Sequence, residues 1–487
     1  MEKVFNIKEV RNLTMLMDFY ELTMSNGYFV NGIKDTKVYF DLFYRKNPDE
    51  GGFAIVAGLQ QVVEYIEGIK FESEDIDYLR SKNLFSEEFL KYLAEFKFRG
   101  DIYAIPEGTP VFPNEPLITV KGNAIEAQLV ETMLLVTVNH QSLIATKTNR
   151  IVRAAKGRTV LEFGARRSQG YDGAIFGARA AYIAGAHGSA TVISDELFKV
   201  PASGTMAHSW IQLFGDEYKA FCIYAKTYPD ACTLLVDTYS VLNSGIPNAI
   251  RVAKEVLEPM GKRLKGIRID SGDIAYLSKE TRRILDEADM KDCKIIASNS
   301  LDEFLITELL NQGAEIDIFG VGERLVTAKS EPVFGGVYKL SAVEEKGEVI
   351  PRIKISENAE KVTNPGYKSL WRLYDKRTGM AIGDVLTLAH EEIDHTKPYT
   401  IFDEVHTWKK KKLTNFYAKK LQVPVFINGE CVYELPEVEE IRNYCKEQLD
   451  TIWEEVKRFS NPHTYYVDLS EELWKMKHEL VLKYSEE

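Results

Sequence analysis

The sequence predicts an α/β protein built around an irregular parallel βα barrel, with an N-terminal α+β domain before it and a C-terminal α-rich extension after it. The main observation is a unit of apolar strand, polar or glycine turn and amphipathic helix, which repeats from about residue 160 to about residue 325. The second is length, because 487 residues exceed what one hydrophobic core usually serves. We expect the three regions to span residues 1–135, 136–345 and 346–487.

Composition narrows the classes of function. Hydrophobic residues make up 45% of the chain and charged residues 28%, and no segment approaches the roughly 18 apolar residues that a membrane span needs. The start of the chain lacks a signal sequence, so we expect a cytoplasmic protein. A net charge of −12 argues against nucleic acid as a partner, because such proteins neutralise phosphates with a basic surface. Five scattered cysteines without a CxxC pair argue against both a zinc site and disulfides.

The N-terminal region mixes helical and strand periodicities, which is typical of an α+β domain. Apolar residues recur at helical spacing over residues 13–28, 53–69 and 74–96, and residues 38–44 alternate as a strand does. Short β runs between prolines over residues 98–122 predict strands joined by tight turns. A mostly helical stretch without proline or glycine, residues 126–155, then leads into the repeat.

The repeat has the period of βα units. Its apolar strands are centred near residues 234, 267, 295 and 318, at intervals of about 23 to 33 residues. Such units either close into a parallel barrel or form an open parallel sheet, and we favour the barrel. Beyond residue 338 we expect β hairpins and then two charged helices, at 435–459 and 470–484. We interpret the lysine run from Lys409 to Lys412 as a solvated face.

Polar side chains follow the ends of the predicted strands. In barrels and open parallel sheets the active site lies at the carboxyl ends of the strands, so these residues are the candidates for chemistry. They are richer in groups that bind phosphates, hydroxyls and metals than a solvated loop face would be. The set comprises Arg166, Arg167, His208, Asp237, Tyr239, Arg268, Asp270, Ser271, Asp273, Ser298, Asn299, Gly320 and Gly322.

The sequence RIDSGD, which begins at Arg268, is a candidate phosphate site. It places Ser271 and Gly272 at the start of a helix, where backbone N–H groups bind phosphate and glycine permits close approach. The carboxylate of Asp270 could meet ribose hydroxyls or magnesium. The alternative is that Ser271 or Asp273 only caps the helix.

Three further features point to an anion site. Arg166 follows the strand that ends near Phe163, and a guanidinium group there suits carboxylate or phosphate, although a surface ion pair is the alternative. The sequence FGVGERLVT supplies Gly320 and Gly322 in a second glycine turn, which by itself is weak evidence. His208 lies in GTMAHSW among small residues, where a large substrate can reach a side chain, although most histidines are structural.

These motifs together resemble the nicotinate phosphoribosyltransferase family. The resemblance runs from MDFYELTM, at residues 17–24, to GGVYKL, which ends at residue 340. It includes EFGARRSQGYDGAIFGARAAYIAG, GTMAHSW, VDTYSVLNSGIPNAI, RIDSGD and FGVGERLVT in the family's order. The resemblance implies a type II phosphoribosyltransferase fold. It also implies transfer of phosphoribose from 5-phosphoribosyl 1-diphosphate to nicotinate, coupled to ATP hydrolysis, as the first step of NAD salvage from nicotinate.

The resemblance also implies site residues and partners. In the family the histidine of GTMAHSW is phosphorylated by ATP, which gives His208 that role here. The pyridine ring lies between two aromatic side chains, one from each subunit of a homodimer, and Phe163 and Tyr20 match them. Magnesium is expected to accompany the phosphorylated substrates. The resemblance places Arg166, Thr205 and Arg268 at nicotinate or the adjoining phosphate, Asp270 at the ribose, and Ser271, Gly272, Gly320 and Gly322 at phosphates.

Two departures from related proteins affect the expected specificity. Animal relatives carry threonine where this chain has Glu323, so we expect backbone groups to bind phosphate there and Glu323 to point away. Nicotinamide-specific relatives carry an aspartate where Ser189 stands, so we expect this site to prefer the carboxylate. The alternatives are an enzyme of the same fold that uses nicotinamide or quinolinate, and a catalytically idle nucleotide-binding relative.

Overall fold

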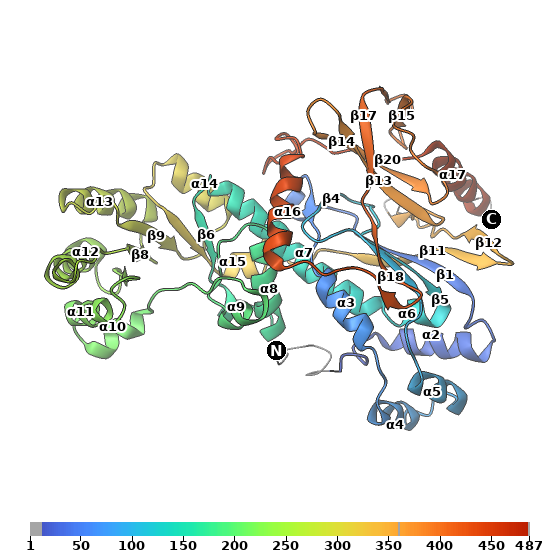
Figure 1. Cartoon of the computed structure of the whole chain (residues 1–487), viewed down its shortest axis with the longest axis horizontal. Coiled ribbons are helices and arrows are strands. Elements are labelled where there is room, and N and C mark those ends of the chain that lie inside the picture. The colour runs from blue at the N-terminus through green and yellow to red at the C-terminus, as the bar shows by residue number, and fades with distance from the viewer. Residues whose placement is uncertain (1–11, 359–360, 486–487) are drawn as a thin grey trace. The chain divides into compact units, whose positions relative to one another are not determined.

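The computed structural model describes residues 12–358 and 361–485, which form two compact units (Figure 1). Unit 1 combines the described parts of Met1–Thr146 and Val333–Glu487, and unit 2 is Lys147–Pro332. The boundary near residue 146 falls inside the long helix α7, Glu131–Ala154. Residues 1–11, which carry most of the argument for a cytoplasmic location, lie outside the described residues. Among the described helices, none combines the length and the apolar character needed to cross a membrane.

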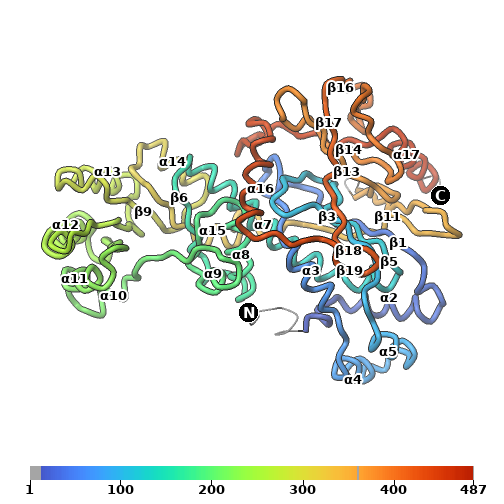
Figure 2. Tube along the Cα trace, viewed as in Figure 1, coloured from blue at the N-terminus to red at the C-terminus, as the bar shows by residue number. Residues whose placement is uncertain are grey.

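The main sheet of unit 1 joins strands from both ends of the chain. Its order is β12-β11-β1-β5-β3-β18-β19, and β18 pairs antiparallel with β3 (Figure 2). The chain therefore forms two units instead of three consecutive regions, because strands beyond residue 346 complete the N-terminal sheet. The strands are β1 Lys37–Phe43, β3 Asp101–Ala104, β5 Ile118–Asn123, β11 Val337–Glu345, β12 Glu348–Pro351, β18 Val423–Ile427 and β19 Glu430–Cys431.

The C-terminal part of unit 1 holds more strand than the sequence predicted. A second sheet has the order β17-β13-β14-β20, and β15 pairs with β16. The expected α-rich character is therefore wrong: only α16, Val438–Asp450, and α17, Glu471–Ser485, are helices among the described residues after 346, apart from isolated turns. The strands are β13 Lys368–Asp375, β14 Ala381–Leu388, β15 Tyr399–Phe402, β16 Lys410–Leu413, β17 Phe416–Lys420 and β20 Val467–Leu469.

The helices of the N-terminal region are shorter than their apolar periodicity suggested. Helix α2, Phe19–Val30, begins late because Asp18 and Glu21 form a capping box at its N-terminus. The predicted helix 53–69 divides into β2, Ala54–Ile55, which pairs with β4, Pro110–Val111, and α3, Leu59–Gly68. Gly58 joins them with a φ of 107°, which favours glycine. The remaining helices here are α4 Ser73–Ser81, α5 Glu87–Ala94 and α6 Ala124–Gln128.

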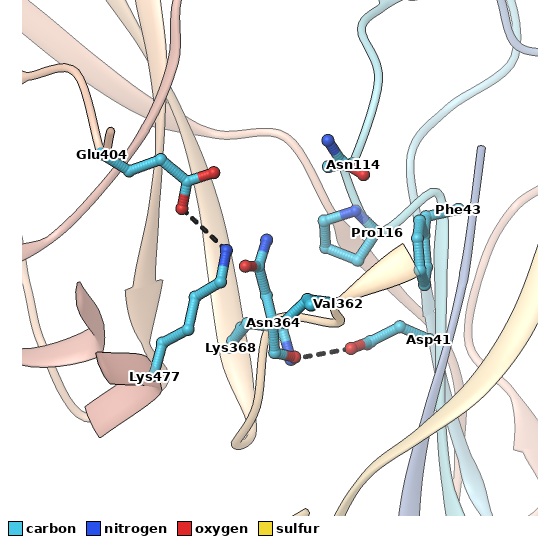
Figure 3. Close-up of a pocket in the computed structure, with 9 residues that line it drawn as sticks. All are labelled: Asp41, Phe43, Asn114, Pro116, Val362, Asn364, Lys368, Glu404 and Lys477. Atoms are coloured by element: carbon cyan, nitrogen blue, oxygen red, sulfur yellow. Dashed lines mark hydrogen bonds and ion pairs between the residues drawn. The ribbon is translucent and has the colours of Figure 1, made fainter. Parts of the chain in front are cut away.

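Unit 1 also contains a small polar cavity of about 110 Å³, shown in Figure 3. The buried Lys368 ammonium group lies 2.8 Å from Asp41 Oδ2, while Asp41 Oδ1 accepts a hydrogen bond from Thr119. On another wall, Lys477 donates to Glu404 at 2.7 Å. The charged groups that line this cavity therefore pair with one another, joining β1 to β13 and α17 to the segment after β15.

Unit 2 is organised around a parallel sheet with the order β6-β10-β9-β8-β7, as the βα repeat predicted. Helix α13, Ile274–Glu287, packs against β8 and β9, and an apolar core runs from Met206 to Ile295 beneath the helices. The strands are β6 Thr159–Glu162, β7 Thr233–Leu235, β8 Gly266–Ile269, β9 Lys294–Ser298 and β10 Ile318–Val321. The other helices are α8 Tyr171–Ile183, α9 Val192–Phe198, α10 His208–Phe214, α11 Glu217–Thr227, α12 Ile246–Val252, α14 Glu303–Asn311 and α15 Glu323–Val326.

A closed barrel is not confirmed. Beyond β6 the parallel order continues only as two isolated bridges, Glu162 with Ser189 and Ser189 with Ala202. In the part of the chain that the structure describes, no strand pairing joins the Ala202 segment to β7. Between residues 186 and 207 the chain forms helix α9 flanked by irregular segments instead of full strands, so the ladder of hydrogen bonds stays incomplete.

Candidate active site

Arg268 is the centre of a hydrogen-bond network at the carboxyl ends of the strands of unit 2. It points from β8, and its guanidinium group donates to Ser298 at 2.8 Å, to Thr205 at 3.0 Å and to Asp270 at 2.8 Å. Ser298 also donates to Asp270. The network joins the ends of β8 and β9 to the segment before α10. The three residues that fix the arginine therefore come from three separate segments of the chain.

His208, the first residue of α10, lies beside two carboxylates. Its Nε2 is 3.9 Å from Asp237 Oδ1 and 3.9 Å from Asp270 Oδ2, and its Nδ1 lies 3.1 Å from the Thr238 hydroxyl. The His208 side chain is 40% exposed, whereas that of Asp237 is 1% exposed. The imidazole is therefore held by Thr238 from beneath while part of the ring stays open to a ligand, which suits a nucleophile.

Asp237 connects the histidine to the RIDSGD turn. Its Oδ2 accepts hydrogen bonds from the backbone N–H of Asp270 at 3.0 Å and from the Ser271 hydroxyl at 2.5 Å. Its Oδ1 is buried and has no hydrogen-bond donor among the described residues. A buried carboxylate oxygen without a donor is costly, and apart from His208 Nε2 at 3.9 Å no cation of the described residues offsets that cost.

Phe163 lies at the end of β6 against a glycine of β10. A Cβ atom added to Gly320 would lie 2.6 Å from both Cδ2 and Cε2 of the Phe163 ring, and the Arg268 guanidinium carbon lies 5.6 Å from the centre of that ring. Gly322 is also close, because an added Cβ would lie 3.1 Å from the Phe163 carbonyl oxygen. These glycines leave room for the aromatic ring beside the arginine, which is a role that the sequence interpretation did not foresee.

Glu162 fixes the turn that carries Phe163. It is buried, accepts hydrogen bonds from the Gly164 backbone and from the Ser189 hydroxyl at 2.6 Å, and burial raises the pKa of its carboxyl group above the usual value. Ser189 also accepts a hydrogen bond from the Thr191 backbone. Ser189 is fully buried, and its hydroxyl is already engaged both as a donor and as an acceptor within the turn.

The RIDSGD turn combines a cap with an open backbone. Asp273 caps α13 by accepting from the Tyr276 N–H at 2.9 Å, so the capping alternative is confirmed for Asp273. Gly272 has a φ of 82° and is exposed, as is Ser271. At the end of the next strand, Asn299 and Ser300 have φ values of 85° and 51°. Two consecutive non-glycine residues with positive φ have a strained backbone, and such strain is typical of functional sites.

The structure does not bring every predicted residue into this network. Arg166 is exposed in a short helical turn, and no hydrogen bond or ion pair places it beside Arg268 among the described contacts. Tyr20 belongs to unit 1. Glu323 pairs with Lys329 at 2.6 Å, which lowers the pKa of its carboxyl group. Glu323 is therefore already engaged by a lysine of its own turn.

Sequence reasoning did not assign roles to Thr238, Asp237 and Ser298, although the last two follow predicted strands. The signal that could have found them is the set of polar residues in VDTY and ASNS, directly after β7 and β9. Their importance depends on contacts with His208 and Arg268, and the spacing along the chain does not contain those contacts.

Comparisons with known proteins identify the family of the chain. Models of the nicotinate phosphoribosyltransferase N-terminal domain, family and C-terminal domain match residues 15–139, 159–377 and 367–477. The chain is 45% identical over 482 residues to the nicotinate phosphoribosyltransferase of Bacillus subtilis, which covers 98% of this chain and 97% of the relative. A human relative of the same name is 30% identical over 521 residues, covering 94% of this chain and 95% of the relative.

Solved structures agree with the sequence comparisons. The crystal structure of human nicotinic acid phosphoribosyltransferase superposes with a TM-score of 0.83 at 29% identity, covering 96% of this chain and all of the other. That of a nicotinate-nucleotide pyrophosphorylase from Pyrococcus furiosus gives a TM-score of 0.69 at 25% identity, covering 92% and 96%. The chain thus belongs to the nicotinate phosphoribosyltransferase family.

Proposed function

We propose that the chain transfers phosphoribose from 5-phosphoribosyl 1-diphosphate to nicotinate, giving nicotinate mononucleotide and diphosphate, with coupled hydrolysis of ATP. One observation carries this proposal: three different groups gather at one edge of the unit 2 sheet. They are the aromatic ring of Phe163, the guanidinium group of Arg268 and the imidazole of His208, which lies beside two carboxylates. Family membership supports the same reaction.

The nicotinate would lie on Phe163 with its carboxylate toward the arginine. A flat pyridine ring gains from an offset aromatic partner, and Arg268 donates in a planar fork that matches a carboxylate. Thr205 orients Arg268 through the 3.0 Å hydrogen bond and lies beside the same anion. Arg166, which is exposed, would reach the substrate from the loop after β6. Ser189, where nicotinamide-specific relatives carry an aspartate, is fully buried and engaged by Glu162 and Thr191, so we expect the site to favour the acid.

The second substrate would lie along the turns after β8 and β10. Asp270 would meet the ribose hydroxyls, and the backbone around Ser271, Gly272, Gly320 and Gly322 would bind the phosphates; Ser271 and Gly272 are exposed, and Gly272 has a positive φ. Transfer at the ribose carbon passes through a carbocation-like centre, so catalysis comes chiefly from positioning and from stabilising the departing diphosphate. Magnesium belongs to this proposal because a hard cation binds through one or two carboxylates plus phosphate oxygens. The unpartnered Oδ1 of Asp237 fits such a ligand.

His208 would take the γ-phosphoryl group of ATP. Its ring nitrogen attacks phosphorus, the bond from phosphorus to the ADP oxygen breaks, and water later releases phosphate. While phosphorylated, the ring adds negative charge beside Asp237 and Asp270, which changes the electrostatics of the diphosphate site. A homodimer is also part of the proposal, in which Tyr20 of one subunit covers the pyridine ring in the site of the other. The irregular barrel of type II phosphoribosyltransferases is proposed for the unit 2 sheet and its two extra bridges.

The direct test is an assay of the purified chain with 5-phosphoribosyl 1-diphosphate and nicotinate, with and without ATP and magnesium. We expect nicotinate mononucleotide to form, and to form faster with ATP. Nicotinamide and quinolinate serve as alternative substrates in parallel reactions. If either of them were turned over faster than nicotinate, it would replace nicotinate as the proposed substrate. If none of the three gave a product, the alternative of a catalytically idle nucleotide-binding relative would be favoured.

Replacing Gly320 by alanine is expected to weaken nicotinate binding. The new methyl group meets the Phe163 ring at 2.6 Å, so the ring must shift away from its position beside Arg268. Overpacking of this kind costs about 1–3 kcal/mol. Because the displaced ring is the proposed binding surface for nicotinate, most of this cost should appear as a higher KM for nicotinate. Gly204→Ala is the matched control, because an added Cβ there meets nothing within 4 Å. An unchanged KM in Gly320→Ala would show that the ring does not bind the substrate.

A further inference from the structure

A cavity of about 1020 Å³ lies in the C-terminal part of unit 1, formed by residues between Asp375 and Asp468. Its walls come from β15, β16, the segment after α16 and the residues before β20. Small-molecule sites usually measure about 300–1,000 Å³. The cavity is therefore large enough for one ligand of nucleotide size, and none of the residues proposed for the transfer reaction contributes to it.

One wall of this cavity carries the lysine run. Lys409 to Lys412 are all exposed and line the cavity, and no carboxylate of the described chain lies within ion-pair distance of any of them. In the β15–β16 ribbon, Lys411 pairs with Ile401, and both Ile401 and Leu413 are buried in a local apolar core. Because side chains alternate along a strand, Lys411 lies on the same face of β16 as Leu413. We interpreted the lysine run from the sequence as a purely solvated face, and that interpretation does not explain why these lysines line a cavity.

Exposed aromatic rings also line this cavity. Trp453 is 44% exposed and Tyr466 is 46% exposed, although both line the cavity. The indole N–H of Trp453 donates to the Ala381 carbonyl at 2.7 Å, which fixes the polar edge of the ring. His463 packs edge-on against Tyr466 with ring centres 6.1 Å apart. Fixed aromatic faces of this kind bind flat rings by stacking.

The acidic groups of the cavity form no ion pair with the lysines among the described residues. Asp375 pairs with Arg377 at 3.1 Å. Asp403 accepts backbone hydrogen bonds from His406 and Val405, and these bonds together with the nearby Lys409 lower the pKa of its carboxyl group. Burial, together with nearby Asp403 and Glu404, raises the pKa of Asp468 to about 7. The unpaired ammonium groups therefore remain available to an anionic ligand.

We propose that this cavity binds a nucleoside polyphosphate, with its base against Trp453 and Tyr466 and its phosphates at Lys409 and Lys411. The combination of aromatic faces and unpaired lysines matches a flat base joined to an anionic chain. A nucleic acid strand or a long acidic peptide fits less well, because the cavity takes one small molecule and the whole chain carries a net charge of −12. The site lies in the unit that does not hold the Arg268 network, and it does not depend on the proposed reaction.

Calorimetric titration of the full chain with ADP tests this site, because ADP is not consumed in the absence of other substrates. We expect Lys411→Glu to remove one ADP site per chain. Lys419→Glu is the matched control: it makes the same charge change at an exposed lysine of the neighbouring strand β17, outside the cavity. Retention of every ADP site in Lys411→Glu, or equal losses in both variants, would overturn the proposal.

The contribution of the aromatic wall is tested separately. Tyr466→Ser is expected to weaken ADP binding at the same site by at least about fivefold, because stacking on the ring is lost. Tyr466→Phe keeps the ring and should bind as the unchanged protein does. Inorganic tripolyphosphate, which has no base, should bind more weakly than ADP at this site. Equal binding of tripolyphosphate and ADP, or no effect of Tyr466→Ser, would contradict recognition of a base.

Discussion

His208→Ala is expected to abolish the coupling of ATP hydrolysis to nicotinate mononucleotide formation, while slow transfer of phosphoribose continues. The imidazole is the only group in the proposed mechanism that accepts the γ-phosphoryl group, whereas Phe163 and Arg268 would still bind nicotinate. We expect ATP turnover in the presence of both other substrates to fall by at least about 10²-fold, the lower end of what a catalytic side chain contributes. Parallel assays of released phosphate and of nicotinate mononucleotide measure the coupling ratio.

Two further variants distinguish phosphoryl transfer from a structural role of His208. His208→Asn keeps a polar group near the Thr238 hydroxyl, which lies 3.1 Å from the ring, but cannot take the phosphoryl group. It should lose coupling as the alanine variant does. His390→Ala, at an exposed histidine that pairs with Glu472 in unit 1, should leave coupling unchanged. If the protein labelled with γ-³²P-ATP carried an acid-labile phosphate in the wild type and equally in His208→Ala, the assignment to His208 would be wrong.

Asp384→Asn is expected to cost about 3–5 kcal/mol of unfolding free energy, because it leaves a buried arginine without its counter-ion. Arg372 and Asp384 are both fully buried, and the arginine donates three hydrogen bonds to the carboxylate, at 2.9, 3.1 and 2.6 Å. Arg372 also donates to the Pro110 carbonyl, and Tyr465 donates to Asp384. Denaturant unfolding monitored by near-ultraviolet circular dichroism measures the loss.

The same pair allows a sharper test of the energetics. Replacing both partners with apolar residues, as in Arg372→Met with Asp384→Leu, removes both buried charges and should recover much of the stability. Asp375→Asn is the control, since it weakens the pair between Asp375, the last residue of β13, and the exposed Arg377, and it should shift the midpoint little. If the double variant were less stable than Asp384→Asn, the hydrogen bonds of the pair would contribute to the free energy of unfolding beyond the mutual neutralisation of the two charges.

Glu115, which lies beside Asp384 and Arg372, is expected to make the stability of the protein depend on pH. It is fully buried, and burial followed by the neighbouring Asp384 carboxylate raises the pKa of its carboxyl group well above the usual value. The folded protein therefore holds a proton that the unfolded chain releases above about pH 4.3. This contribution to stability is complete below that pH and is lost as the pH rises through the folded pKa. Glu115→Gln should flatten this decline, measured as the unfolding midpoint against pH from 5 to 9.

Local sequence patterns were sufficient for much of unit 2. The alternation of apolar strands and amphipathic helices predicted β7, β8, β9 and β10, because each unit is encoded by a contiguous stretch with its own period. Parallel strands place their carboxyl ends at one edge of the sheet. That rule alone gathered Arg268, Asp270 and His208, and the structure shows them within one network. The resemblance to a family then supplied roles that composition and spacing do not contain.

The sequence by itself determined the βα repeat, the polar edge of its sheet and, through its motifs, the family. The tertiary structure decided which strand completes which sheet, because pairings such as β18 with β3 join residues more than 300 positions apart and leave no periodic signal. It also decided that Asp237 holds the RIDSGD turn and that Gly320 makes room for Phe163. The lysine run shows the same division, since its residues are plain in the sequence and only the tertiary structure brings them to a cavity that is also lined with aromatic rings.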